Sequence, residues 1–176
     1  MNLPNKLTLL RVIMVPVFVI FMMLPADWGR WAALAVFIIA SLTDTADGYI
    51  ARKYNMITDF GKFMDPLADK ILVYAAFCLM VADHTIPAWT LIIILCREFL
   101  VAGIRTVAAS EGIVIAADMA GKIKTVLQMV ATCLLIIAGY HIVFYYGGYI
   151  LFYASLAMTV YSGINYCTKN IEVFKD

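Results

Sequence analysis

The sequence predicts an all-α integral membrane protein with six transmembrane helices. Hydrophobic residues make up 64% of the 176-residue chain, charged residues make up 14%, and the mean hydropathy is +0.91. These values lie outside the usual range for a water-soluble domain. An apolar helix needs about 20 residues to cross about 30 Å of hydrocarbon, so the chain has room for about seven spans at most. We therefore expect a single membrane domain over residues 1–176, with a short interfacial segment at residues 1–6.

Polar turns delimit the first three expected spans. The first apolar run ends where Pro25 opens a turn that continues to Arg30, and the second run ends before the polar segment that starts at Asn55. The third run follows that segment and stops before Asp83. The predicted helices are 7–25, 31–54 and 61–82.

The last three spans are separated in the same way. Pro87 marks the start of the fourth run, and the segment 111–118 separates it from the fifth. His141 opens the last turn and Gly147 closes it. The predicted helices are 87–110, 119–140 and 148–168.

The distribution of Lys and Arg predicts the orientation of these helices. If both termini are cytoplasmic, twelve of the 13 Lys and Arg residues fall on the inner side or inner half of the spans, and Arg30 falls outside. We therefore expect a multi-pass protein of the plasma membrane with both termini in the cytoplasm. The net charge of +1 and the lack of a long basic run argue against a nucleic-acid partner.

Five of the 12 acidic residues lie in a short stretch that begins at Asp44 and ends at Asp69. Asp44 and Asp47 are three residues apart and Asp65 and Asp69 are four apart, so each pair lies on one face of its helix. An ionised Asp at the centre of a membrane helix costs about 2.5–3.5 kcal/mol to insert, so these charges need compensation. Carboxylate oxygens suit Mg²⁺, Mn²⁺ or Ca²⁺, which predicts a metal site. Salt bridges to neighbouring Lys and Arg residues are the alternative.

Two small residues extend the acidic face of the second helix. Gly48 follows Asp44 by four residues, and Ala51 follows Gly48 by three. A bulky ligand could approach the backbone there, although small residues also serve close helix packing in membranes.

The spacing Asp44-x2-Asp47-Gly48-x2-Ala51-Arg52-x8-Gly61-x3-Asp65-x3-Asp69 resembles the signature of the CDP-alcohol phosphotransferase family at every fixed position. The resemblance implies six transmembrane helices, a homodimer, a polar metal site that opens to the cytoplasmic side, and two bound divalent cations, Mg²⁺ or Mn²⁺. It implies that the four Asp residues bind metal and that Asp69 also acts as the catalytic general base. The nucleotide lipid, CDP-diacylglycerol, would be bound by Gly48, Ala51, Arg52 and Gly61.

Four cations outside this stretch predict a site for a phosphate group. Arg97 and Arg105 are eight residues apart on the fourth span and share a face, while Lys122 and Lys124 start the fifth span. A buried Arg with neighbouring Lys residues is a good phosphate receptor. The alternative is anchoring of the inner helix ends together with an ion pair between Arg97 and Glu98.

The segments NLPNKLTLLR (2–11), REFLVAGIR (97–105) and GKIKTVLQ (121–128) resemble those of the family branch that uses glycerol 3-phosphate. The implied reaction transfers the phosphatidyl group of CDP-diacylglycerol to sn-glycerol 3-phosphate, giving phosphatidylglycerophosphate and CMP in phospholipid biosynthesis. The last span carries no specific signal. Two alternatives stay open: a family member that acts on another alcohol, of the phosphatidylinositol-phosphate or cardiolipin synthase type, and a metal or ion transporter, because intramembrane carboxylates often mark ion pathways.

Overall fold

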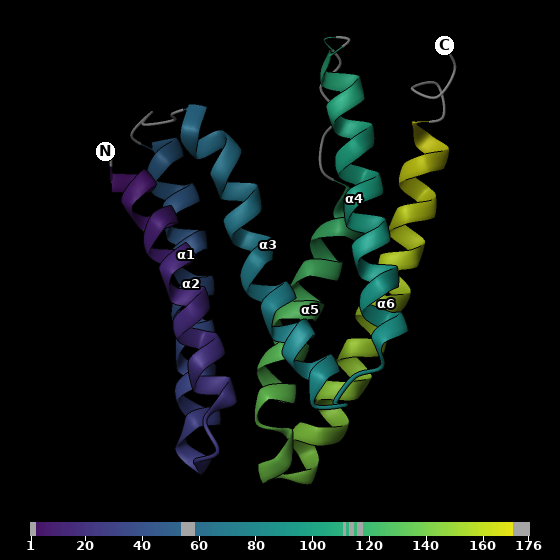
Figure 1. Ribbon diagram of the computed structural model, residues 1–176. Helices are drawn as coiled ribbons and strands as arrows, with labels where there is room; N and C mark the ends of the chain where they lie inside the picture. Colours follow the sequence, from purple (N-terminus) through teal and green to yellow (C-terminus); the bar gives the residue numbers. More distant parts are fainter. Residues whose placement is uncertain (1–2, 54–58, 111, 113–114, 116–117, 171–176) are drawn as a thin grey trace.

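The computed structural model describes the backbone of residues 3–53, 59–110, 112, 115 and 118–170 (Figure 1), and the side chains of residues 9–43, 70–110, 112, 115 and 118–170. Regular structure in this part of the chain is entirely helical, which confirms the predicted all-α class. The helices are α1 (Leu3–Met23), α2 (Asp27–Lys53), α3 (Asp59–Ala82), α4 (Ala88–Ser110), α5 (Met119–Ile136) and α6 (Ile142–Lys169), with a 3₁₀ turn η1 (Ala138–Tyr140) between the last two.

The helices run up and down, so both ends of the chain lie at the same end of the bundle (Figure 1). α1 lies along α2, and α5 packs extensively against α6. α4 packs on α6, whereas α3 connects the two halves and makes few contacts with α4 and α5. We call the end with the termini the terminal end, and the opposite end, where the short turns after α1, α3 and α5 meet, the turn end.

The buried core lies toward the turn end. Phe18, Phe37, Phe77 and Phe152 have no exposed surface and come from four different helices. The rings of Phe77 and Phe152 meet edge to face with centroids 5.6 Å apart, which joins α3 to α6. This core fixes one end of the bundle and leaves the terminal end for polar groups.

The start of α6 differs from the sequence prediction. α6 begins at Ile142 rather than at 148, because the Nδ1 atom of His141 accepts a hydrogen bond from the Val143 backbone N–H at 3.2 Å and caps the helix. Gly148 lies inside α6 against Leu135, where a Cβ atom would be 2.9 Å from its Cδ2 atom. The sequence predicted that helical structure is interrupted over 141–147. After His141 this prediction is wrong, because Gly148 packs closely against Leu135 and does not interrupt the helix. The other boundaries fall within about four residues of those expected, and α1 already begins at Leu3.

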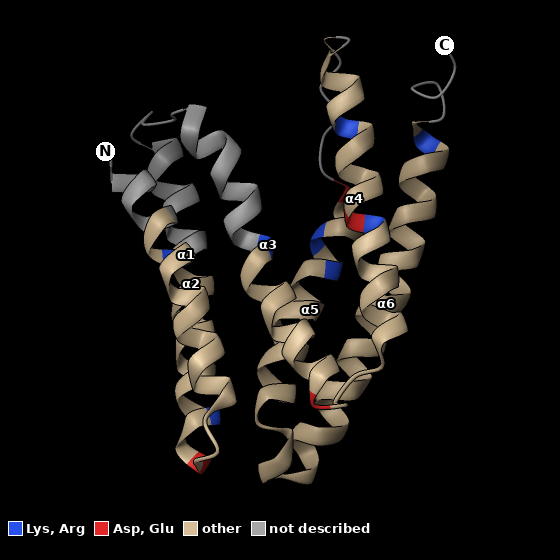
Figure 2. Ribbon diagram, viewed as in Figure 1, with Lys and Arg blue, Asp and Glu red and all other residues tan. Residues whose placement is uncertain are grey.

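The surface and the charges fit a membrane protein. Two of the described helices, α5 and α6, are long and apolar enough to cross a membrane, while Arg97, Glu98 and Arg105 interrupt the apolar run of α4. Large apolar side chains on the outside are exposed, including Phe99 at 69%. Most described Lys and Arg residues lie toward the terminal end (Figure 2), whereas Arg30 belongs to the first turn of α2, at the turn end.

The packing of α5 on α6 gives a test of the fold. Gly148→Ala places a Cβ atom 2.9 Å from Cδ2 and 3.0 Å from Cγ of Leu135. Overpacking of this kind costs about 1–3 kcal/mol, so we expect a lower midpoint of thermal unfolding in detergent, measured by circular dichroism. Gly103→Ala in α4 is the control, because its Cβ atom would meet nothing within 4 Å. Equal midpoints for the two variants would contradict the packing described here.

Candidate functional site

The four cations expected to bind phosphate come together in the structure. Arg97 and Arg105 of α4 and Lys122 and Lys124 of α5 all line one cavity of about 680 Å³. α6 contributes Tyr166 to its wall. We call this space the cationic cavity. The structure therefore brings together, from two helices, the four cations that the sequence predicts to bind a phosphate group.

The cationic cavity has an exposed mouth and a buried floor. Arg105 and Lys122 are exposed, Arg97 is half-buried, and Lys124 is only 4% exposed. Cations at the mouth attract an anion from solution, whereas those at the floor bind it where water is scarce and charge interactions are stronger. The arrangement suits a small anion that enters from one side.

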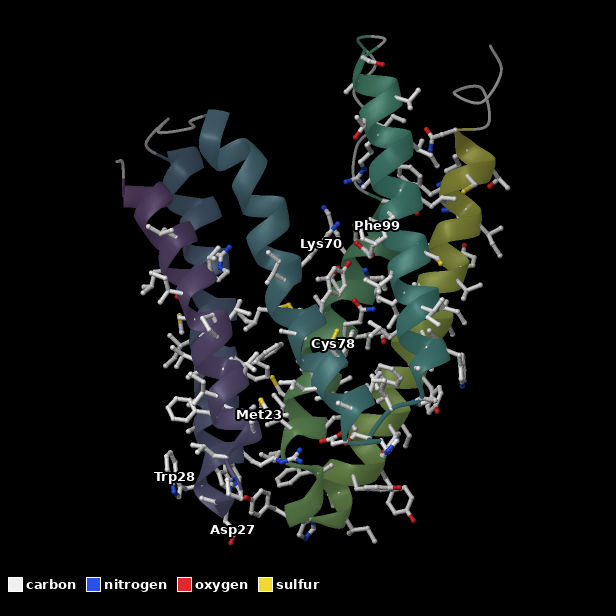
Figure 3. The ribbon with its side chains drawn as sticks, viewed as in Figure 1. Met23, Asp27, Trp28, Lys70, Cys78 and Phe99 are labelled. Atoms are coloured by element: carbon white, nitrogen blue, oxygen red, sulfur yellow. The ribbon has the colours of Figure 1, made fainter. Side chains whose placement is uncertain are left out.

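Among the described side chains, the carboxylate of Glu98 lies between the floor cations. Glu98 of α4 is buried, and its Oε1 atom accepts hydrogen bonds from Arg97 Nη1 at 2.9 Å and from Lys124 Nζ. Its Oε2 atom is 2.9 Å from Nζ of Lys70, which projects from α3 (Figure 3). The Arg97–Glu98 ion pair that the sequence left open is thus present, and it coexists with the cavity. Lys70 was not among the residues expected to bind phosphate.

Helix α6 holds both arginines of α4. The Ser162 hydroxyl accepts hydrogen bonds from Nε and Nη2 of Arg97 at 3.1 and 2.8 Å. The Tyr166 hydroxyl accepts one from Nε of Arg105 at 3.0 Å, and the Arg105 guanidinium carbon lies 5.5 Å from the centre of the Tyr166 ring. These contacts fix the direction of two long side chains that would otherwise be free to rotate.

The sequence interpretation missed the role of α6, although a signal is present. Four hydroxyl-bearing side chains recur at intervals of four, three and four residues in a largely hydrophobic helix, so they share one face. All four are buried in the structure. They are Ser155, Thr159, Ser162 and Tyr166.

Close approach between α4 and α6 depends on Gly163. A Cβ atom at this position would lie 3.1 Å from Cγ of Arg97. The missing side chain leaves room for the aliphatic part of Arg97 to pass α6, so that its guanidinium reaches Ser162. A glycine beside a buried hydroxyl therefore shapes the floor of the cationic cavity.

The expected metal ligands lie on the helices predicted for them. Asp44 and Asp47 belong to the last turns of α2, and Asp65 and Asp69 belong to the first half of α3. Their helical backbone keeps each pair on one face, and four carboxylates are a donor set that fits Mg²⁺ or Mn²⁺. Their side chains lie outside those that the structure describes, as do the side chains expected to bind the nucleotide lipid, Gly48, Ala51, Arg52 and Gly61. Among the side chains that the structure describes, no group of three or more His, Cys, Asp or Glu residues is placed to hold a metal ion.

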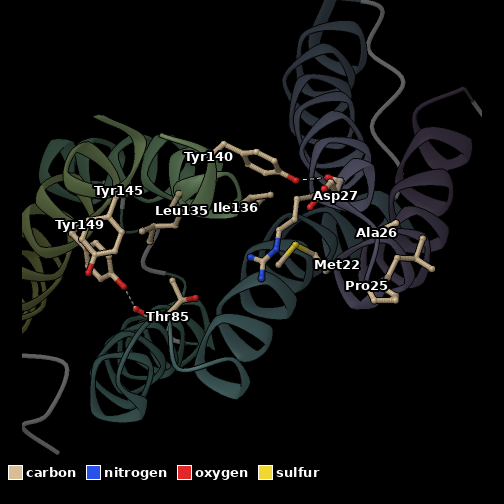
Figure 4. Close-up of a pocket in the computed structure, with 14 residues that line it drawn as sticks. Met22, Pro25, Ala26, Asp27, Thr85, Leu135, Ile136, Tyr140, Tyr145 and Tyr149 are labelled. Carbon is tan, nitrogen blue, oxygen red and sulfur yellow. Dashed lines mark hydrogen bonds between the residues drawn. The ribbon is translucent and has the colours of Figure 1, made fainter. Parts of the chain in front are cut away.

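A second cavity, of about 520 Å³, lies at the turn end (Figure 4). Its hydroxyl groups connect neighbouring turns: Tyr140 donates to the backbone carbonyl of Asp27, and Tyr149 donates to that of Thr85. Among the described residues, none of those expected at the functional site lines this cavity. Its polar groups hold the turns together, and we assign the functional site to the cationic cavity.

Comparison with known proteins agrees with these observations. The family model described as CDP-alcohol phosphatidyltransferase matches residues 1–161. A protein of Bacillus subtilis (strain 168) named CDP-diacylglycerol--glycerol-3-phosphate 3-phosphatidyltransferase is 45% identical over 188 aligned positions, which cover 99% of this chain and 97% of the relative. Proteins with the same name from Escherichia coli (strain K12) and Rickettsia typhi are 38% and 36% identical, over 94% of this chain and 92% and 94% of their own lengths. The chain therefore belongs to the CDP-alcohol phosphatidyltransferase family.

Proposed function

We propose that this chain transfers the phosphatidyl group of CDP-diacylglycerol to sn-glycerol 3-phosphate, giving phosphatidylglycerophosphate and CMP. The observation that carries the proposal is the cationic cavity, where Arg97, Arg105, Lys122 and Lys124 converge in a member of this family. An acceptor that already bears a phosphate group needs such a receptor, whereas a neutral alcohol does not. The names of three relatives at 36–45% identity support the same reaction. Membership of a transferase family also disfavours the ion transporter that the acidic residues alone had left open.

The acidic residues of α2 and α3 supply the second half of the proposed site. Asp44, Asp47, Asp65 and Asp69 would hold two divalent cations, Mg²⁺ or Mn²⁺. Cations bound there would neutralise the pyrophosphate of the nucleotide lipid and stabilise the departing phosphate. Gly48, Ala51, Arg52 and Gly61 would bind the nucleotide lipid, with Arg52 on a phosphate oxygen and the small residues leaving room for cytidine.

The chemical step is a displacement at the phosphatidyl phosphorus. The acceptor hydroxyl gives its proton to Asp69, and its oxygen forms a bond to this phosphorus while the bond to the CMP oxygen breaks. Arg97 and Lys124 hold the acceptor's own phosphate at the floor of the cationic cavity, which directs the hydroxyl toward the helices that carry the acids. Holding both reactants in one orientation is the main contribution expected of the protein in phosphoryl transfer.

The membrane arrangement follows from the same proposal. All six helices of the single domain over 1–176 span the plasma membrane, and the terminal end faces the cytoplasm. The gathering of Lys and Arg toward that end supports this orientation. Glycerol 3-phosphate is water-soluble, so a cavity that opens toward the cytoplasm admits it directly. The homodimer implied by the family resemblance is part of the proposal.

The identity of the acceptor substrate tests the proposal. Purified protein in detergent with CDP-diacylglycerol and Mg²⁺ is given radiolabelled glycerol 3-phosphate, glycerol, inositol phosphate, phosphatidylglycerol or serine. We expect label in lipid with glycerol 3-phosphate, and rates with glycerol lower by about 10²-fold or more, because glycerol lacks the phosphate group that the cations of the cavity would bind. Lipid labelling that requires an inositol compound or phosphatidylglycerol would replace this acceptor with another one used in the family.

The metal requirement gives a second prediction. A chelator should abolish CMP release, and added Mg²⁺ or Mn²⁺ should restore it. Asp69→Asn should lower kcat by about 10²–10⁴-fold, the usual contribution of a general base. Asp27→Asn at the turn end, where the side chain is exposed, is the control and should leave CMP release unchanged. Full activity in chelator would remove the metal site from the proposal.

Arg97 gives a third prediction. Hydrogen bonds to a charged group contribute about 1.5–3 kcal/mol, so Arg97→Ala should raise KM for glycerol 3-phosphate by about tenfold to a hundredfold. KM for CDP-diacylglycerol should change far less. Arg97→Lys should restore little, because an ammonium cannot reproduce the planar fork that reaches both Ser162 and Glu98. Arg30→Ala at the turn end is the control, and equal effects on both substrates would indicate a structural role for Arg97.

A further inference from the structure

Glu98 forms ion pairs with cations from three different helices. Its Oε1 atom binds Arg97 of its own helix and Lys124 of α5, while its Oε2 atom binds Lys70 of α3 at 2.9 Å. The Glu98 side chain is 7% exposed and that of Lys124 is 5% exposed, so this part of the cluster is shielded from water. The side chain of Lys70 is 39% exposed and also lines the cationic cavity. Lys70 is therefore the member of the cluster most accessible to a ligand.

The charges of this cluster do not cancel. Within this cluster of described side chains, one carboxylate faces three cations, which gives the cluster a net charge of +2. A phosphate monoester carries a charge of about −1.5 to −2 at neutral pH, because its second pKa is about 6. The surplus therefore matches the acceptor's phosphate. Each ammonium also has three N–H donors, of which the hydrogen bond to Glu98 uses one.

Lys70 connects the cationic cavity to the acid-bearing helix. It directly follows Asp69 on α3, and α3 makes few packing contacts with α4 and α5. The hydrogen-bonded ion pair with Glu98 thus joins the part of α3 next to Asp69 to the two helices that carry the phosphate-binding cations. A shift of α3 relative to α4 would change the distance between the acceptor's phosphate and the general base.

We propose that Glu98 is the positioning residue of the acceptor site and that Lys70 is a further phosphate-binding residue which Glu98 holds in place. Glu98 gathers Lys70, Arg97 and Lys124 so that all three face one phosphate group. Through Lys70 it also sets the place of that phosphate relative to Asp69. This inference rests on the proposed function, since it assumes an acceptor that carries a phosphate group.

Steady-state kinetics of the purified full chain test the inference, with each substrate varied in turn. Glu98→Gln and Lys70→Gln should each raise KM for glycerol 3-phosphate by about tenfold or more, the usual effect of removing a group that orients a ligand-binding residue. KM for CDP-diacylglycerol should change by less than about twofold, since binding of the nucleotide lipid does not use the cluster. The double variant should be little worse than Glu98→Gln alone, because loss of the Glu98 carboxylate already releases Lys70.

Two further variants separate positioning from other roles. Glu98→Asp keeps the charge but is one methylene shorter, so it should reach fewer of the three cations and give an intermediate KM. Arg30→Gln breaks an ion pair to Asp83 at 3.1 Å at the turn end and should change neither KM. If Glu98→Gln fails to fold, Lys70→Gln still tests the inference, because the Lys70 side chain is more exposed.

Several outcomes would overturn the inference. A lower KM for glycerol 3-phosphate in Glu98→Gln would show that Glu98 competes with the phosphate instead of arranging its receptors. Equal rises in both KM values would indicate a purely structural ion pair. Additive effects in the double variant would show that the role of Lys70 does not depend on Glu98. The unaltered chain distinguishes these results from failure of the proposed function: if it makes no phosphatidylglycerophosphate from glycerol 3-phosphate, the proposed function fails, whereas normal synthesis with unaffected variants rejects only the role of Glu98 and Lys70.

Discussion

The ion pairs of Glu98 are the interaction on which the acceptor site depends. Removing a carboxylate or an ammonium from water costs several kcal/mol for each ion, even after the protein relaxes, and loss of one partner leaves the other charge uncompensated. Glu98 and Lys124 are both buried, so neither is stable at this place without the other. The pair lets α4 and α5 carry charge into an apolar bundle. Arg97 and Lys70 can then complete the cavity floor with a lower desolvation free energy than isolated cations would require.

Helix α6 supports the cationic cavity through polar side chains, although most of its residues are hydrophobic. Ser162 and Tyr166 hold the two arginines of α4, and the Asn165 side chain donates a hydrogen bond to Asp118 at 2.8 Å just before α5. Polar groups of one helix therefore restrain both helices that carry the cations of the cationic cavity. Hydroxyl and amide groups serve this purpose well in a membrane, because they satisfy donors on neighbouring helices without adding charge. Gly163 keeps α6 close enough to α4 for these bonds to form.

The sequence predicts what depends on local spacing and misses what depends on contacts between helices. Hydropathy gives the helical class and the order of the six helices. Arg97 and Arg105 in the fourth span and Lys122 and Lys124 at the start of the fifth predict a phosphate receptor, and all four line one cavity. The predicted start of α6 was wrong, because the sequence alone does not distinguish a glycine that packs against Leu135 from a glycine that ends a helix. The partnership of Lys70 with Glu98, 28 positions along the chain, depends on how α3 lies against α4, which no local pattern records.

A site that holds four acids and several cations must keep the two groups from neutralising each other. Lys70 illustrates the difficulty, because it adjoins Asp69 and the sequence allowed it to pair with the acids. In the structure its ammonium forms an ion pair with Glu98 on α4. Glu98 thus holds the Lys70 ammonium at the cationic cavity. In the proposed site, α3 would then serve both halves, with carboxylates for the metal ions and an adjacent ammonium for the acceptor's phosphate.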